Sequence, residues 1–357
     1  MTGPSRKILV GVLGATGAVG QRMVSLLARH PWFDLVELAA SERSAGRTYG
    51  EAASWRLADP LPDAIARMRV RALDPGTGSF RARILFSALD ADVAGEAESR
   101  LASAGHAVVS NAKNHRMAAD VPLVIAEVNR EHLALIPAQR RRLGSEGFIV
   151  TNPNCSSTGL TMALAPIHER FGVASVVAAT LQAVSGAGYP GLPSMDILDN
   201  AVPYISGEEE KIEREPRKML GRLAAGAGEV DEAAIEIAAM VHRVPVVDGH
   251  LVSAFVTTRE RADPAAVLAA WREWSQARAL DLPTAPAEPL LYLEAPDRPQ
   301  TRLDRERGGG MTTSIGRLRP VPGGALRFAC LSHNTLRGAA GASVLNAELL
   351  VREKYVS

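Results

Sequence analysis

The stretch Ile8-Leu9-Val10-Gly11-Val12-Leu13-Gly14-Ala15-Thr16-Gly17-Ala18-Val19-Gly20 decides the fold of the first part of the chain. Its first six residues form the short apolar run that a buried parallel strand needs. Three glycines then recur at a spacing of three, and residues 21–30 continue with helical spacing. Glycines at such a turn let the backbone approach a pyrophosphate, which then lies on the helix N-terminus. The stretch predicts a dinucleotide-binding turn, with a tight strand-to-helix turn that binds nothing as the alternative. The residues of this turn expected to contact the dinucleotide are Gly14, Thr16, Gly17, Ala18, Val19 and Gly20.

Strand-like and helix-like segments alternate over roughly the first 150 residues. Further strands are expected at residues 35–40, 83–88, 106–110 and 147–151, and a helix at 96–104. This alternation predicts an α/β fold with a Rossmann-like, doubly wound parallel sheet.

The rhythm changes after residue 155. Long strands are expected at 173–182 and 251–258, and helices at 229–240 and 264–276. This pattern predicts a second, α+β domain. The proline-rich segment 285–299 is expected to be a surface excursion, and residues 338–356 an amphipathic helix.

Composition excludes several classes of protein. The net charge of +1 gives no broad basic surface for nucleic acid. No uncharged apolar run reaches about 18 residues, so no membrane span is expected, and no signal peptide is recognisable at the N-terminus. Two cysteines cannot form a disulfide framework, which is typical of a reducing cytoplasm. No compact cluster of histidine and cysteine has the spacing of a metal site.

The segment Asn152-Pro153-Asn154-Cys155-Ser156-Ser157 joins an expected strand to an expected helix. A cysteine at a helix N-terminus is close to unpaired N–H groups, which lower the pKa of a thiol from about 8.5. The same groups stabilise the oxyanion formed when a thiolate attacks a carbonyl. Cys155 is therefore a candidate nucleophile, with a buried structural cysteine as the alternative. Cys330 is expected to be a packed strand residue.

The end of the second strand discriminates between the two nicotinamide dinucleotides. Here Ser41, Arg43 and Ser44 offer two hydroxyls and a cation to a 2′-phosphate, provided that Glu42 points away. This segment favours NADP(H) over NAD(H), with a polar surface loop as the alternative.

Several segments, in order along nearly the whole chain, resemble the aspartate-β-semialdehyde dehydrogenase family, particularly its archaeal and fungal branch. They are residues 14–20, 41–46, 110–117, 152–157, 182–191, 208–211, 243–250 and 334–350. The resemblance implies reversible, NADPH-dependent reduction of L-aspartyl 4-phosphate to L-aspartate 4-semialdehyde and phosphate, in lysine, threonine and methionine biosynthesis. Residues 56–80 and 285–302 match no motif of the family.

The resemblance implies three catalytic residues. Cys155 matches the nucleophile, whose thiolate displaces phosphate and forms a thioester. His250 matches the acid/base; independently, it follows the turn-like Asp248-Gly249 and begins an apolar strand, and imidazole titrates near neutrality. His333, His115 and His242 are weaker candidates. Gln182 matches the residue that orients the substrate near the thiol.

The resemblance also assigns residues that bind the substrate. Arg243 matches the arginine for the α-carboxylate, and Glu208 matches the acid for the α-ammonium, although Glu209 leaves that register open. Lys211 lies three residues after Glu208, on the same side of a helix, and is assigned to phosphate. The basic segment after residue 110 is likewise assigned to phosphate, through Lys113, Asn114 and Arg116. A surface ion pair and a solvated basic turn are the respective alternatives.

The remaining expected cofactor contacts are Ser87, Ser185, Gly186 and Asn334. The resemblance divides the chain into an NADP-binding domain at 1–153, completed by the C-terminal helix 334–357, and a catalytic and dimerisation domain at 154–333. The implied assembly is a homodimer or homotetramer.

Two other readings remain open. A paralogous reductase of acyl phosphates or thioesters, such as malonyl-CoA reductase, has the same fold but needs no carboxylate for an ammonium group, which Glu208 argues against. A non-catalytic, NADPH-sensing binding protein leaves Cys155 and His250 unexplained.

Overall fold

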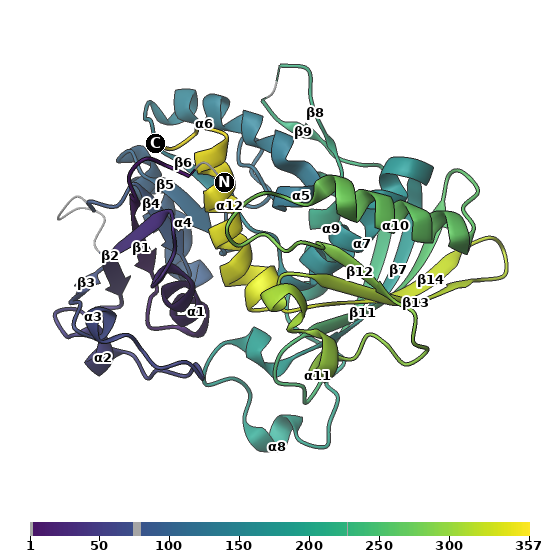
Figure 1. Ribbon diagram of the computed structural model, residues 1–357, viewed down its shortest axis with the longest axis horizontal. Helices are drawn as coiled ribbons and strands as arrows, with labels where there is room; N and C mark the ends of the chain where they lie inside the picture. Colours follow the sequence, from purple (N-terminus) through teal and green to yellow (C-terminus); the bar gives the residue numbers. More distant parts are fainter. Residues whose placement is uncertain (1–2, 74–79, 227) are drawn as a thin grey trace.

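The protein contains two six-stranded sheets joined by helices, as a computed structural model shows (Figure 1). The structure describes residues 3–73, 80–226 and 228–357. The motif-poor region 56–80 therefore lies partly outside the described residues.

The first sheet is parallel throughout, in the order β3-β2-β1-β4-β5-β6. This is the strand order of a Rossmann fold, so the predicted doubly wound sheet is confirmed. Its strands are β1 Ile8–Leu13, β2 Phe33–Ala40, β3 Val70–Ala72, β4 Ile84–Ser87, β5 Ala107–Ser110 and β6 Phe148–Thr151.

Helices cover both faces of this sheet. The segments between its strands are α1 Ala18–Leu27, α2 Tyr49–Ala52, α3 Asp63–Ala66, α4 Ala91–Ser103, α5 Ala126–Asn129, the 3₁₀ helix η1 Arg130–Leu135 and α6 Ile136–Leu143. Buried side chains of α1 and of the C-terminal helix α12 (Gly341–Arg352) share one core with β1. α4 contributes to a smaller core on the other face.

The turn between β1 and α1 explains its glycines. Gly14 has φ +71°, a conformation that side chains with a Cβ rarely adopt. A Cβ on Gly20 would overlap the Gly14 carbonyl. The absence of a side chain at Gly20 therefore lets α1 start close to the strand. Gly17 caps α1 without any side-chain hydrogen bond. The N-terminus of α1 is therefore open to a ligand.

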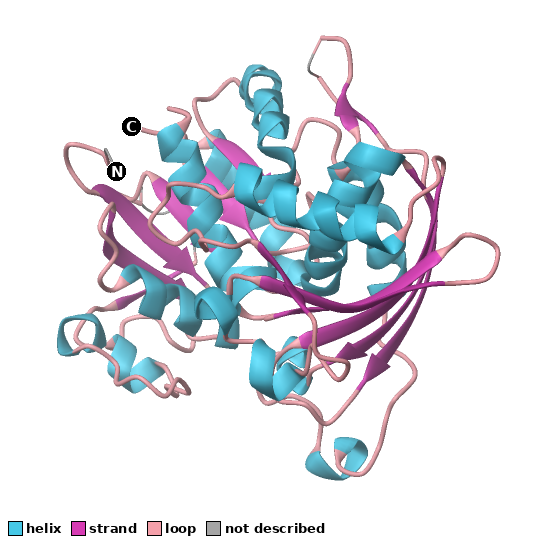
Figure 2. Ribbon diagram, turned by 45° about the vertical axis from the view of Figure 1, so that its right-hand side comes forward, coloured by secondary structure: helices cyan, strands magenta, loops and turns pink. Residues whose placement is uncertain are grey.

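The second sheet is mixed, in the order β10-β7-β11-β14-β13-β12. Helices α7, α9 and α10 cover one face of it, and no helix covers the other face among the described residues (Figure 2). Its elements, in chain order, are α7 Cys155–Phe171, β7 Val173–Gln182, η2 Val184–Ala187, α8 Ser194–Ile197, α9 Glu208–Met219, β10 Glu236–Arg243, β11 His250–Thr258, α10 Pro264–Arg278, β12 Leu290–Leu293, α11 Thr301–Asp304, η3 Arg307–Gly310, β13 Thr313–Pro320 and β14 Leu326–Ser332. A small hairpin, β8 Arg222–Leu223 with β9 Val230–Asp231, lies apart from it.

Strand register brings three predicted residues to one end of this sheet. β7 and β10 are parallel, and Gln182 pairs with Arg243 at their last residues. β11 runs antiparallel to β7 and starts at His250, so its first residues lie beside the last residues of β7. The three strands thus end or begin at the same edge.

Three sequence predictions are wrong. Residues 229–240 form β9 and most of β10 and not a helix, because pairing with β7 overrides their alanine-rich helical propensity. The segment 285–299 is no simple excursion, since β12 pairs with β13. The C-terminal segment is not amphipathic: it begins as a π-helix, η4 Leu336–Ala340, and α12 is buried on most sides between the two sheets (Figure 1).

Within the described residues, no helix is long and apolar enough to cross a membrane.

Candidate active site

A cavity of about 310 Å³ lies where the segments that leave the two sheets meet. Cys155, the first residue of α7, opens onto it. The lining residues come from both halves of the chain: Val19, Asp90, Asn111, Arg116, Asn154, Cys155, Ser185, Gly186, Ala187, Gly188, Asn334, Thr335, Gly338 and Ala339. Predicted nucleophile, phosphate and cofactor residues therefore share one cavity.

The thiol of Cys155 is not acidified in the way that the sequence predicts. Asn154 caps α7, and its Oδ1 accepts from the N–H groups of Ser156 (2.9 Å) and Ser157 (3.3 Å), which are then satisfied. Burial, together with the carboxylate of Glu208, raises the pKa of Cys155 to about 12. Nearby cations at Arg116, Arg243 and Lys211 act in the opposite direction.

His250 is buried beside this cavity with one ring nitrogen fixed. The backbone N–H of Ala183 donates to Nδ1 at 3.0 Å, so the neutral imidazole holds its proton on Nε2. Nε2 has no protein partner among the described residues. Burial and the cation of Arg243 lower the pKa of His250 to about 3. The ring is therefore neutral at pH 7, with a donor at Nε2.

Arg243 and His250 both face the glycine segment after β7. A Cβ added at Gly186 would lie 2.8 Å from Nη1 of Arg243 and 3.2 Å from Nε2 of His250. Arg243 is buried and donates through Nη1 to the carbonyl of Ala183 at 2.7 Å. A side chain at 186 would push against the end of Arg243 and crowd the His250 ring, so this segment lies close to both residues.

Glu208 collects three side-chain donors. Nδ2 of Asn154 reaches its two carboxylate oxygens at 3.1 and 2.9 Å, and Nζ of Lys211 reaches Oε1 at 2.6 Å. Gln182 completes the set at 3.4 Å. Burial opposes the ionisation of Glu208, but Lys211 and Asn154 outweigh it and hold the pKa of Glu208 below its usual value. The carboxylate is therefore charged, and it stands next to the thiol.

Of the three residues predicted to bind phosphate, one lines the cavity and two do not. Arg116 is buried, lines the cavity, and is held by Glu215 at 2.8 Å. Lys113 and Asn114 are exposed and do not line the cavity. Asn114 instead donates to the carbonyl of Ala91 at the start of α4, at 3.0 Å.

Some of the predicted cofactor residues line the cavity, and the others lie outside it. Val19, Ser185, Gly186 and Asn334 line the cavity. Asn334 bridges two other segments, accepting from the N–H of Gly249 and donating to Oγ of Ser185, both at 2.8 Å.

The other cofactor residues surround the glycine turn. Ser41 and Arg43 are exposed after β2, and Ser44 is buried. Ser87 is fully buried at the end of β4, so its side chain does not reach the cavity. With the uncapped N-terminus of α1, the exposed arginine and the exposed Gly17, the residues present fit a dinucleotide.

Sequence reasoning missed residues that hold the site together. Asn154 donates to Glu208, Glu215 accepts from the backbone of Asn154, and Lys218 donates to the segment of Arg116. The available signal for the two α9 residues was their spacing, since Glu215 and Lys218 follow Glu208 and Lys211, respectively, by seven residues. Gly338 was also missed: a Cβ there would lie 2.6 Å from Cβ of Cys155, so only glycine lets the π-helix approach the nucleophile.

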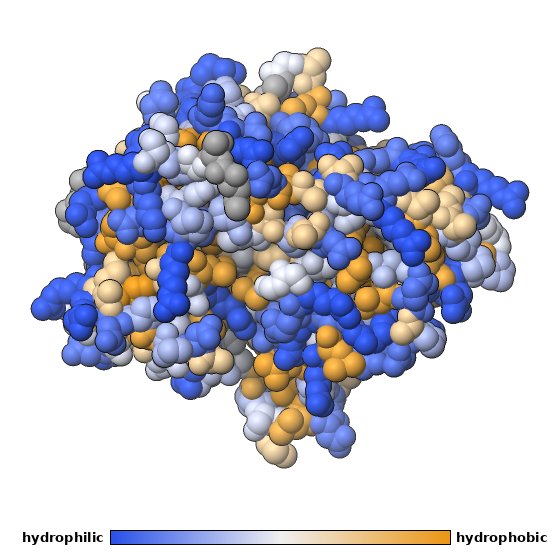
Figure 3. Space-filling view, in the orientation of Figure 1, coloured by the Kyte–Doolittle hydropathy of each residue, from blue (hydrophilic) through white to orange (hydrophobic). Residues whose placement is uncertain are grey.

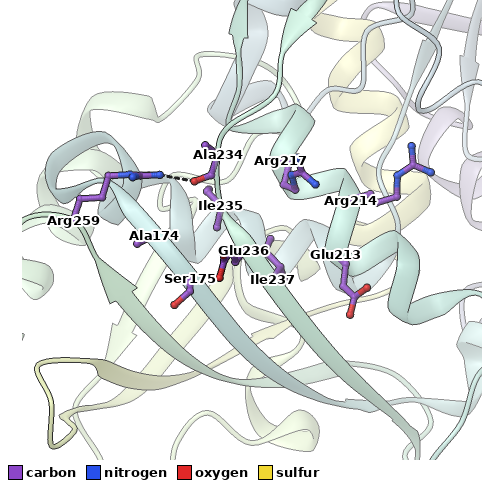
Figure 4. A pocket seen from close by; sticks show the side chains of 10 residues that line it. All are labelled: Ala174, Ser175, Glu213, Arg214, Arg217, Ala234, Ile235, Glu236, Ile237 and Arg259. Atoms are coloured by element: carbon purple, nitrogen blue, oxygen red, sulfur yellow. Dashed lines mark hydrogen bonds between the residues drawn. The ribbon is translucent and has the colours of Figure 1, made fainter.

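A wider cavity, of about 830 Å³, lies away from Cys155 (Figure 4). Arg259 there donates to the carbonyl of Ala234, and α9 contributes Glu213, Arg214 and Arg217. No histidine or cysteine lines it. The described residues hold no group of three or more acidic, histidine and cysteine side chains placed for a metal ion.

Comparison with known proteins agrees with this geometry. Residues 9–136 match the family model for the semialdehyde dehydrogenase NAD binding domain, and residues 164–337 match that for the semialdehyde dehydrogenase dimerisation domain. The chain is 48% identical to the aspartate-semialdehyde dehydrogenase of Archaeoglobus fulgidus, over 97% of this chain and 99% of that one. It is 46% identical to that of Cryptococcus neoformans, over 99% of each chain.

Solved structures extend this likeness to three dimensions. The crystal structure of aspartate semialdehyde dehydrogenase with NADP from Candida albicans superimposes with a TM-score of 0.90 at 42% identity. The match covers 98% of this chain and 100% of that one. With relatives this similar over their full length, and with Cys155 at a cavity that Arg116 also lines, the chain belongs to the aspartate-semialdehyde dehydrogenase family.

Proposed function

We propose that this enzyme interconverts L-aspartyl 4-phosphate and L-aspartate 4-semialdehyde, with NADP(H) as the cofactor, in the biosynthesis of lysine, threonine and methionine. The family membership supports the reaction. The single observation that carries the assignment is the placement of Cys155 within one charged cluster with Glu208, Arg116 and Arg243. These groups match a nucleophile and the binders of an ammonium, a phosphate and a carboxylate.

The substrate binds through its charged groups. Arg243 pairs with the α-carboxylate, for which a planar guanidinium is suited, and Glu208 pairs with the α-ammonium. Gln182, which donates to Glu208, orients the bound substrate. The reacting carbonyl carbon is then held against Sγ of Cys155.

Substrate binding itself activates the thiol. In the free enzyme burial and, after it, the carboxylate of Glu208 raise the pKa of Cys155. An ammonium bound to Glu208 cancels much of that negative charge, so the cations at Arg116, Arg243 and Lys211 then oppose burial alone. The thiol loses its proton more readily when the correct substrate is present.

In the oxidative direction, Sγ of Cys155 adds to the aldehyde, and the proton of the thiol ends on the aldehyde oxygen or in solvent. His250 donates to that oxygen from Nε2, which has no partner among the described residues. NADP held at the glycine turn and at Ser185, Gly186 and Asn334 would supply the hydride acceptor that lets the thiohemiacetal become a thioester on Cys155, and the hydroxyl proton would pass to solvent. Phosphate, held by Arg116 and Lys211, then attacks the thioester carbon, and the C–S bond breaks to release acyl phosphate and thiolate. Lys113 and Asn114, which are exposed and outside the cavity lining, are left without a direct contact to phosphate in this proposal.

The residues proposed for the cofactor are those of the glycine turn, Ser41, Arg43 and Ser44 near the 2′-phosphate, Ser87 at the end of β4, and Ser185, Gly186 and Asn334 at the nicotinamide end. We assign residues 1–153 and 334–357 to the cofactor domain and 154–333 to the catalytic and dimerisation domain. Burial of α12 in the core of the first sheet supports this division.

Arg43→Ala is expected to weaken NADPH binding at least about tenfold and NADH binding by much less, because only the 2′-phosphate meets the lost charge. Titration of each nucleotide, followed by nicotinamide fluorescence, measures both constants. Equal weakening of the two nucleotides would contradict a phosphate contact and indicate a structural role for the loop at 41–46.

Glu208→Gln is expected to lower kcat/KM for aspartate semialdehyde by roughly 10- to 150-fold, since a hydrogen bond to a charged group contributes about 1.5–3 kcal/mol. Succinate semialdehyde lacks the amino group, so its kcat/KM is expected to change little. Steady-state kinetics with both aldehydes test this. Retention of the full preference for the amino substrate would move the ammonium to Glu209 or another acid.

The assembly proposed is a homodimer, or a tetramer built from two such dimers. The uncovered face of the second sheet exposes Val177, Leu181, Met240 and Phe255. Apolar side chains also gather on the protruding segment around α8, where Met195 and Leu198 are exposed (Figure 3). Exposed apolar area of this kind marks protein interfaces, and this half of the chain matches a dimerisation domain.

The free thiols Cys155 and Cys330 suit the cytoplasm, where we place the enzyme.

The decisive assay follows NADP reduction with aspartate semialdehyde, with and without phosphate. Sustained NADPH formation only in the presence of phosphate supports the proposal. A preference for malonyl-CoA would favour the paralogous reductase, and nucleotide binding without turnover would favour a sensing protein.

A further inference from the structure

One polar stripe runs along α9 toward the nucleophile. Glu208, Lys211, Glu215 and Lys218 follow one another at spacings of three, four and three, which places them on one side of a helix. The first two belong to the proposed substrate site. The other two contact no part of the proposed substrate, yet both are buried.

Glu215 joins two segments that are far apart in the sequence. Its Oε1 accepts from Nη1 of Arg116 at 2.8 Å, and its Oε2 accepts from the backbone N–H of Asn154 at 2.6 Å. Asn154 immediately precedes Cys155. One carboxylate therefore sets the position of the Arg116 guanidinium, which is proposed to bind phosphate, relative to Cys155. Phosphate must remove the acyl group from that cysteine.

Lys218 fixes the backbone on the other side of that guanidinium. An ammonium has three donors, and here they reach the carbonyls of Arg116 (2.8 Å), Ala118 (2.7 Å) and Val121 (2.9 Å). All three acceptors belong to the segment that follows β5. Lys218 does not itself line the cavity, and it reaches the lining only through the backbone carbonyl of Arg116.

Arg116 has a donor left for a ligand. Nη1 is used by Glu215 and Nη2 by the carbonyl of Asn111, at 2.7 Å. Its buried Nε has no partner among the described residues. A guanidinium has five N–H donors, so with two of them in use the others remain to hold an anion at a fixed place.

We propose that Glu215 and Lys218 are positioning residues, which set the place of Arg116 beside Cys155 and thereby determine the affinity of the enzyme for phosphate in the thioester-cleaving step. This inference rests on the proposed function, because it needs Arg116 to meet phosphate. The proposal gives the two sides of α9 different roles. The polar stripe positions the site, whereas Glu213, Arg214 and Arg217 line the wider, remote cavity (Figure 4).

Two substitutions test the proposal. In Glu215→Gln, an amide NH₂ replaces one of two oxygens that both accept, so a donor meets either Arg116 or Asn154. Lys218→Met keeps the length of the side chain and removes all three donors. Arg214→Gln, an exposed position on the other side of α9, is the matched control.

The readout separates the two halves of the reaction. Without phosphate, one equivalent of NADPH per site reports folding, aldehyde binding and thioester formation. With phosphate, steady-state rates give the KM for phosphate. Glu215→Gln and Lys218→Met are each expected to raise the KM for phosphate about tenfold or more and to retain the NADPH amplitude and the KM for aldehyde within about twofold. Arg214→Gln is expected to match wild type, and Glu215→Asp, which keeps both oxygens, to recover part of the phosphate affinity.

An unchanged KM for phosphate in both variants would overturn the proposal. So would a parallel loss of NADPH amplitude and turnover, or loss of folding in both variants, since each would show a general structural role. Wild-type enzyme that forms NADPH without any need for phosphate would instead refute the proposed function, which keeps the two failures distinct.

Discussion

Cys155→Ser is expected to remove turnover by at least about 10³-fold while the protein stays folded, because a hydroxyl is a far weaker nucleophile than a thiolate at neutral pH. The change is small, and Cys155 reaches a cavity, so packing is little disturbed. Turnover and the circular dichroism spectrum should be measured on the same preparation.

Cys330→Ser is the matched control for that substitution. Cys330 is buried in β14, and burial raises the pKa of its thiol to about 12, so it stays neutral. We expect the Cys330 variant to keep its turnover and to lose some stability. A folded Cys155→Ser protein with near wild-type turnover would exclude Cys155 as the nucleophile.

His250→Asn is expected to lower kcat by about 10²–10⁴-fold, the usual effect of losing a positioned acid or base, with a smaller effect on KM. Burial and Arg243 lower the pKa of His250 to about 3, so the neutral ring is present throughout the neutral range. The loss of rate should therefore extend across pH 6–8 and not only along one limb of the profile. The measurement is kcat and KM as a function of pH for both proteins.

If His250→Asn kept the rate and its pH dependence, His333 would be the next candidate. His333 is fully buried, and Nε2 lies 3.4 Å from Oε1 of Glu306. The same substitution at His333 is the control. A Cβ at Gly186 would lie 3.2 Å from the His250 ring, and no atom of His333 is among the three atoms nearest to it.

Local patterns in the sequence were enough to predict the first sheet and the ends of its strands. Apolar runs such as Ile8–Leu13 and the glycines after it determine their own conformation, so short-range reasoning suffices. Residues 229–240 show where such reasoning fails. Their alanines favour a helix, but pairing with β7, about 60 residues earlier in the chain, makes most of them a strand.

The candidate site shows the same limit. The sequence predicted that Glu208 and Lys211 share a face of a helix, and the ion pair at 2.6 Å confirms that placement. Long-range contacts escaped prediction, because Glu215 meets Arg116 across 99 residues. The prediction of an acidic thiol was wrong for a similar reason. The helix N-terminus was inferred locally, whereas burial and the carboxylate of Glu208 raise the pKa of the thiol and Asn154 satisfies two of the N–H groups.

The central claim is that turnover passes through an acyl group on Cys155. The most direct measurement mixes enzyme, NADP and aspartate semialdehyde without phosphate, quenches the mixture in acid, and maps the protein by mass spectrometry. We predict one equivalent of NADPH per site and an added acyl mass on the peptide that contains Cys155, discharged when phosphate is supplied. Continuous NADPH formation without phosphate, with no added mass at Cys155, would contradict the account.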